Sequence, residues 1–96
     1  MFSKVPINPE KLSKENVDRE ILRVSIAAEL DAVSLYEQFA DMAGNKNLKK
    51  VLFDIAKEEK THIGEFQAML LRLDKEQAGE LENGRKEVEE LTGEDY

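Results

Sequence analysis

The chain has 96 residues, enough for one small domain of two or three helices but too short for a four-helix bundle with long helices. Its 21 acidic and 14 basic residues give a net charge of −7, so nucleic acid is not an expected partner. The absence of cysteine excludes disulfides, thiolate zinc sites and iron–sulfur clusters, and is compatible with a reducing cytoplasm. No apolar run approaches the roughly 18 residues of a membrane span, so no membrane segment is expected.

The first part of the chain predicts an extended arm followed by a long helix. Both prolines lie within residues 1–12, which we expect to be extended. Ser13 and Asn16 are candidate N-caps for a helix over about 17–43, a stretch without glycine or proline. Gly44-Asn45-Lys46-Asn47 then predicts a turn, with Asn47 as a candidate cap of the next helix.

The second part predicts a long helix over about 48–75 and a short third helix over about 82–91. Gly79 and Gly84 interrupt the pattern between them. No alternating strand pattern is present. The predicted fold is therefore all-α: a single domain over residues 1–96, built as an antiparallel helical hairpin with a short C-terminal helix.

Each long helix carries a stripe of residues at steps of three and four, the spacing of one buried face. Both stripes are apolar except at Glu29, Glu59, His62 and the semi-polar Tyr36. The first stripe comprises Leu22, Ile26, Glu29, Val33, Tyr36, Ala40 and Ala43; the second comprises Leu48, Leu52, Ile55, Glu59, His62, Phe66, Met69 and Leu73. A carboxylate on a buried face is unfavourable unless it is paired or bound to a metal.

The hairpin brings the three polar stripe residues to one level. Counted from the turn and at ~1.5 Å per residue, Glu29, Glu59 and His62 fall within roughly 5 Å of one another along the hairpin axis. Glu59 and His62 form a Glu-x-x-His pair on one helix face. Di-iron carboxylate bundles use a glutamate from each of two helices and Glu-x-x-His from each of the other two. One hairpin holds half of this set, and a dimer forming a four-helix bundle would hold all of it.

Oxygen and imidazole donors suit iron or manganese, although these ligand types do not exclude zinc. The same residues also allow a purely structural interpretation, because a lone histidine is more often structural and Glu29 alone could be a boundary position. Asp31 and Glu65 lie off the stripes and are candidates for acids beside the ligands or on the path by which iron reaches them.

The segments Ala27-Ala28-Glu29-Leu30-Asp31-Ala32 and Lys57-Glu58-Glu59-Lys60-Thr61-His62 resemble the encapsulated ferritins, short ferritin-like proteins housed in encapsulin nanocompartments. The resemblance covers roughly residues 20–91. It implies that Glu29, Glu59 and His62 bind iron across a dimer interface, that Tyr36 lies near the site, and that the dimers form a ring, commonly a decamer.

The sequence departs from this family at two places. Ala28 stands where family members carry an acid that helps iron to enter, which leaves Asp31 as the other acid of that path. No apolar shell-docking peptide is visible in residues 93–96. Either the peptide lies outside this sequence, or the domain belongs to a chain fused to its shell protein.

The leading functional prediction is a ferroxidase that oxidises Fe(II) with dioxygen at a di-iron site shared by two subunits. It would feed iron storage inside a cytoplasmic encapsulin shell. Two alternatives remain open: a metal-free helical oligomerisation module, and another di-metal enzyme such as a rubrerythrin-like peroxidase.

Overall fold

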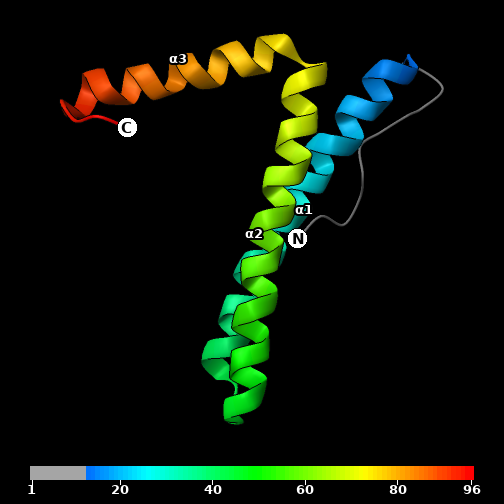
Figure 1. The fold of residues 1–96 in the computed structure, drawn as a ribbon, viewed down its shortest axis with the longest axis vertical. Helices are drawn as coiled ribbons and strands as arrows, with labels where there is room; N and C mark the ends of the chain where they lie inside the picture. Colours follow the sequence, from blue (N-terminus) through cyan, green and yellow to red (C-terminus); the bar gives the residue numbers. More distant parts are fainter. Residues whose placement is uncertain (1–12) are drawn as a thin grey trace.

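The computed structural model describes residues 13–96, which form three α-helices (Figure 1). These are α1 (Lys14–Met42), α2 (Lys46–Leu73) and α3 (Lys75–Thr92). Helices α1 and α2 form an antiparallel hairpin, and α3 leaves the end of α2 at a steep angle (Figure 1). The predicted all-α hairpin with a C-terminal helix is confirmed. The predicted arm over residues 1–12 lies outside the described residues, and none of the helices in residues 13–96 is long and apolar enough to cross a membrane.

Side-chain caps define where the hairpin helices begin. Ser13 caps α1, as predicted, by accepting a hydrogen bond of 3.3 Å from the backbone N–H of Asn16. Asn45 caps α2 and accepts from the backbone N–H groups of Asn47 and Leu48, at 2.9 and 3.0 Å. The prediction that Asn47 is this cap was wrong, because the Asn45 side chain already satisfies two of the free N–H groups at the helix start.

Helix α3 begins at Lys75, well before the predicted start near residue 82. Asp74 ends α2 and also caps α3, since its side chain accepts a 3.0 Å hydrogen bond from the backbone N–H of Gln77. The predicted short helix was wrong because a strong cap and the residues after it outweigh the helix-weakening effect of Gly79 and Gly84.

Two ion pairs stabilise the C-terminal half of α3. The Arg85 guanidinium contacts the carboxylates of Glu82 and Glu89, each at 2.6 Å, one turn away on either side. Hydrogen bonds to these two carboxylates raise the pKa of Arg85 far above its usual range. The helix ends at Thr92, and its C-cap is Gly93, whose φ of 72° lies in the left-handed region that glycine adopts without strain.

The hairpin buries little of its apolar surface. Within residues 13–96, the buried hydrophobic side chains are Leu22, Ala40, Ala56 and Leu70. Large apolar side chains that are 44–79% exposed lie on both hairpin helices, at Leu30, Phe39, Met42, Leu48, Val51, Phe53 and Met69. Two of them, Leu48 and Met69, belong to the stripe predicted to be buried on α2. They are exposed because α1 covers only one side of α2, and the stripe extends beyond that side.

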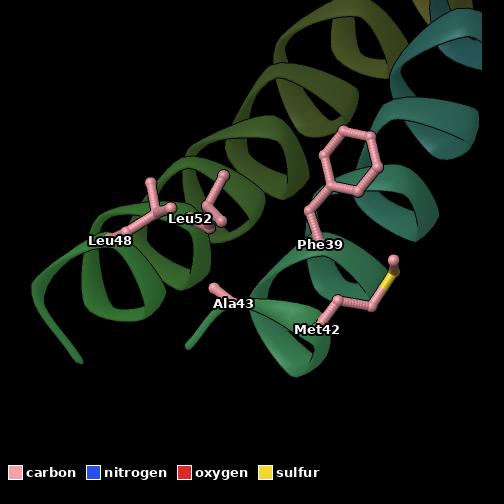
Figure 2. A pocket seen from close by; sticks show the side chains of 5 residues that line it. All are labelled: Phe39, Met42, Ala43, Leu48 and Leu52. Carbon is pink, nitrogen blue, oxygen red and sulfur yellow. The ribbon is translucent and has the colours of Figure 1, made fainter. Parts of the chain in front are cut away.

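An apolar hollow of about 330 Å³ lies at the turn end of the hairpin (Figure 2). It is lined from both helices and the turn by Phe39, Met42, Ala43, Leu48 and Leu52. This hollow continues the exposed apolar surface, so a single hairpin leaves much of its hydrophobic free energy unused.

Replacing Gly79 or Gly84 by alanine should stabilise the protein. Apart from the neighbouring residues and the backbone of the helix itself, nothing lies within 4 Å of the position that an added Cβ would occupy at either glycine. Alanine is favoured over glycine in a helix by roughly 0.5–1 kcal/mol. Urea unfolding followed by circular dichroism measures the change. Gly93→Ala is the control and should destabilise, because its positive φ strains any residue with a Cβ. A loss of stability in both Gly79→Ala and Gly84→Ala would contradict the helical environment described for them.

Candidate metal centre

Glu29 on α1 and Glu59 and His62 on α2 converge in the structure. One potential ligand atom from each lies within 4.8 Å of those of the other two. The Nδ1 atom of His62 is 3.4 Å from Glu29 Oε2 and 3.4 Å from Glu59 Oε2. The antiparallel hairpin causes this convergence, since Glu59 and His62 are one turn apart on α2 and Glu29 lies at their level on α1.

The three side chains differ in how far they are withdrawn from solvent. The side chains of Glu29 and Glu59 are 22% and 17% exposed, whereas that of His62 is 45% exposed. The two carboxylates therefore lie at the seam, the line along which α1 and α2 are in contact. The imidazole lies at the solvent-exposed edge of this seam, which is its open edge. The cluster is accessible from one side of the single hairpin.

One carboxylate oxygen is buried without a hydrogen-bond donor. Among the described residues, Glu29 Oε2 receives no hydrogen bond, and its near neighbour is the His62 nitrogen at 3.4 Å. A buried anionic oxygen without a donor is unfavourable, and a bound cation removes that cost. This oxygen therefore fits a metal ion better than it fits a purely structural role.

The donor set also suits a divalent transition metal. Two carboxylates and one imidazole are ligands for iron, manganese or zinc, and three ligands leave coordination positions open. Because Nδ1 of His62 faces the carboxylates, binding through this atom requires the neutral tautomer with its proton on Nε2. Two carboxylates and a neutral imidazole carry the charge that balances one divalent ion per chain.

The other predicted site residues lie outside this cluster. Tyr36 and Asp31 are half-buried on α1, and Glu65 is exposed on α2. In the part of the chain that is described, the group of mutually close ligand atoms consists of Glu29, Glu59 and His62. The roles of Tyr36, Asp31 and Glu65 near the site or on the iron path stay predictions.

An ion pair that the sequence did not suggest crosses the hairpin next to the cluster. Lys60 Nζ lies 3.2 Å from Glu37 Oε2, so the residue that follows Glu59 is tied to α1. Both side chains are 46–60% exposed, and the pair contributes little to stability on its own. It was missed because both residues lie off the apolar stripes, and charged surface residues give no pairing signal.

Comparison with known proteins identifies the family. The family model described as Rubrerythrin matches residues 20–93. The crystal structure of the encapsulated ferritin domain from Pyrococcus furiosus superimposes with a TM-score of 0.83 and 47% sequence identity, over 97% of this chain and 100% of that one. The chain belongs to the encapsulated ferritins, within the rubrerythrin family. The resemblance found in the sequence is thereby confirmed.

Two full-length relatives of this encapsulated ferritin are longer proteins. A ferritin-like–encapsulin shell fusion protein of Pyrococcus furiosus is 53% identical over 87 residues, which are 91% of this chain and 25% of the relative. The encapsulin nanocompartment cargo protein EncC of Myxococcus xanthus is 39% identical over 70 residues, which are 73% of this chain and 53% of the relative. The chain thus spans about a quarter of one relative and about half of the other.

Replacing either carboxylate of the cluster by its amide should weaken metal binding. Glu29→Gln and Glu59→Gln keep the shape of the side chain but remove the charge, so the affinity for Co(II) should fall by about tenfold or more, as for other losses around metal sites. Isothermal titration calorimetry under anaerobic conditions measures the affinity. Glu58→Gln, which changes the exposed neighbour on the same helix, should bind Co(II) like the unchanged chain. Equal affinities in all four proteins would remove Glu29 and Glu59 from the metal site.

Proposed function

We propose that the chain is a ferroxidase, in which two copies share a di-iron site and oxidise Fe(II) to Fe(III) with dioxygen. The observation that carries this proposal is the cluster of Glu29, Glu59 and His62 at the open edge of the hairpin. One hairpin supplies one glutamate and one Glu-x-x-His pair, half of the ligand set of a di-iron carboxylate bundle.

The exposed surface of the hairpin supports a shared site. His62 is 45% exposed at the edge of the cluster, and large apolar side chains are exposed along both helices. A second copy facing this side would bury apolar area and bring in its own ligands. The resulting four carboxylates are balanced by two divalent cations.

The residues of the chain would bind and orient the substrate iron. Glu29 and Glu59 supply hard anionic oxygens, which favour the product Fe(III) over Fe(II) because its charge is higher. Each Fe(II) gives up one electron, and dioxygen accepts the electrons; this redox chemistry belongs to the iron and not to the side chains. Tyr36 would lie beside the site, and Asp31 and Glu65 are the proposed acids of the path along which iron arrives and leaves.

The relatives suggest where this activity operates. One relative is named as a fusion to an encapsulin shell and another as an encapsulin cargo protein. We therefore propose that the domain works inside a cytoplasmic encapsulin nanocompartment, as cargo or fused to the shell protein. Its dimers would form a ring, a decamer in the proposed assembly, and the shell would supply the enclosed space for the stored iron.

The match to the rubrerythrin family supports a second candidate, a peroxidase that reduces hydrogen peroxide at the same di-metal site. The oxidant distinguishes the two activities. Fe(II)-loaded protein should react rapidly with air as a ferroxidase, whereas a peroxidase should react faster with peroxide and should need an external electron donor to turn over.

Glu29→Ala should abolish rapid oxidation of Fe(II) without loss of helix. The substitution removes a carboxylate from the cluster and introduces a better helix former. Fe(II) is added anaerobically, air is admitted, and the formation of Fe(III) is followed by absorbance. His62→Ala should slow the reaction similarly, while Glu58→Ala is the matched control. If Glu29→Ala oxidises Fe(II) at the rate of the control, the ferroxidase assignment to this cluster is wrong.

Metal and assembly should be linked. In the metal-free dimer, the carboxylates of Glu29 and Glu59 from both copies would repel one another, and a divalent ion relieves this repulsion only when both copies supply ligands. Fe(II) under anaerobic conditions, or Co(II), should therefore shift the chain toward dimers and larger rings. Size-exclusion chromatography with light scattering, with metal and with chelator, measures the mass.

Glu59→Ala is the test variant for this linkage, because it removes two carboxylates per dimer, and Glu58→Ala is its control. The expected result is a metal-dependent mass in the control and none in Glu59→Ala. An identical mass distribution with metal and with chelator in the unchanged chain would show that metal does not drive assembly. If both distributions are those of dimers or rings, apolar burial holds the subunits together unaided, as expected of a metal-free interaction module.

A further inference from the structure

The corner between α2 and α3 is a single residue. Asp74 is both the last cap of α2 and the first cap of α3, with φ −128° and ψ 89°. Because no longer loop intervenes, the direction of α3 depends on the backbone angles around this position. In Figure 1 α3 runs away from the hairpin after the corner, and none of its side chains is buried.

The carboxylate of Asp74 links all three helices. Its Oδ1 accepts the 3.0 Å hydrogen bond from the backbone N–H of Gln77, in the first turn of α3. Its Oδ2 accepts a hydrogen bond of 2.7 Å from Nη2 of Arg23, on α1. These two interactions hold the pKa of Asp74 below its usual value, with the Gln77 hydrogen bond the larger cause.

A second arginine of α1 binds the end of α2. The Nε atom of Arg19 donates a 3.0 Å hydrogen bond to the backbone carbonyl oxygen of Leu73, the last residue of α2. A carbonyl at a helix C-terminus lacks a partner within the helix and lies at the negative end of the helix dipole, so a guanidinium is favoured there. Arg19 and Arg23 thus contact two successive residues at the corner.

Both arginines are held in place by neighbours on α1. Arg19 also donates to Asn16 Oδ1 and to Glu15 Oε1, each at 3.1 Å. Arg23 also donates to the carboxylate of Glu20. Because each guanidinium is oriented by residues one turn away, less conformational entropy is lost when it binds the corner.

We propose that Arg19 and Arg23 form a clamp that sets the direction of α3 relative to the hairpin. Packing within the single chain does not set it, because the apolar side chains of α3 are 40–86% exposed at Leu81, Val88 and Leu91. The backbone at position 74 alone allows several directions. The clamp selects one of these directions. It does so whether or not metal is bound, because the corner lies away from the Glu29–Glu59–His62 cluster along the chain.

The clamp should respond to ionic strength. The side chains of Arg23 and Asp74 are 42% and 16% exposed, so salt reaches their ion pair. At about 1 M salt the screening length falls to about 3 Å, which weakens partly exposed pairs. We therefore expect α3 to sample a narrow range of directions at low salt and a wider range at high salt.

Electron-spin distance measurements between α2 and α3 test the clamp. The chain has no cysteine, so Lys57→Cys and Lys86→Cys, both at exposed positions, place one spin label on each helix. Labelled chains are mixed with an excess of unlabelled chain, so that only distances within one chain are read. The expected result is one narrow distance distribution, which widens about twofold in Arg19→Gln/Arg23→Gln as the corner samples several backbone conformations.

Two further variants make the test decisive. Asp74→Asn keeps an oxygen that can cap α3 but removes the charge that binds Arg23, so it should also widen the distribution. Arg72→Gln removes an exposed guanidinium two residues from the corner and should leave it narrow. Circular dichroism checks that helix content is retained. If the distance distributions of Asp74→Asn and of the double variant are as narrow as that of Arg72→Gln, the clamp does not set the direction of α3. If the double variant loses helix, the distance distribution of Asp74→Asn alone decides.

Discussion

Two carboxylates placed against an apolar seam are the constraint on which the rest of this structure depends. Glu29 and Glu59 are largely withdrawn from water between α1 and α2, and Glu29 Oε2 receives no hydrogen bond from the residues described. A hairpin optimised only for stability would have apolar side chains there, because withdrawing two carboxylates from water is unfavourable unless each is fully paired. The arrangement is accounted for if a cation occupies the space between the carboxylates and His62, as proposed.

The small core of the hairpin favours the same proposal. Few side chains are buried, and a helical hairpin of this size gains little stability from its own apolar contacts. A second copy against the side of α2 that carries His62 would bury exposed apolar residues of that face, such as Met69, and would add a second Glu29, Glu59 and His62. In the proposed dimer, association would therefore stabilise the fold and complete the proposed metal site together, which is why metal and assembly should be thermodynamically linked.

The convergence of the candidate site could be predicted from the sequence, whereas several local details could not. Helical spacing and the turn together place Glu29 at the level of Glu59 and His62, and the structure brings them together; that they bind metal stays a proposal. The sequence does not predict the early start of α3 although Asp74 and Gln77 have the spacing of a cap, because the two glycines after them favour an interrupted helix. The exposure of Met69 could not be foreseen, since periodicity shows that a face is apolar but not which neighbour covers it.

Polar contacts help to fix how α1 and α2 are aligned along the hairpin, because the few buried side chains are too small a core to fix this alignment alone. Asn45 fixes the start of α2 at the turn, the Glu37–Lys60 pair crosses the middle, and Arg19 and Arg23 tie α1 to the end of α2. Each contact contributes little to the free energy of unfolding. However, a slip of one residue along a helix moves a side chain by about 1.5 Å and rotates it by about 100°, which would carry Glu29 out of reach of Glu59 and His62. In a hairpin with so few buried side chains, weak contacts spread along its length help to keep the potential ligand atoms of Glu29, Glu59 and His62 within 4.8 Å of one another.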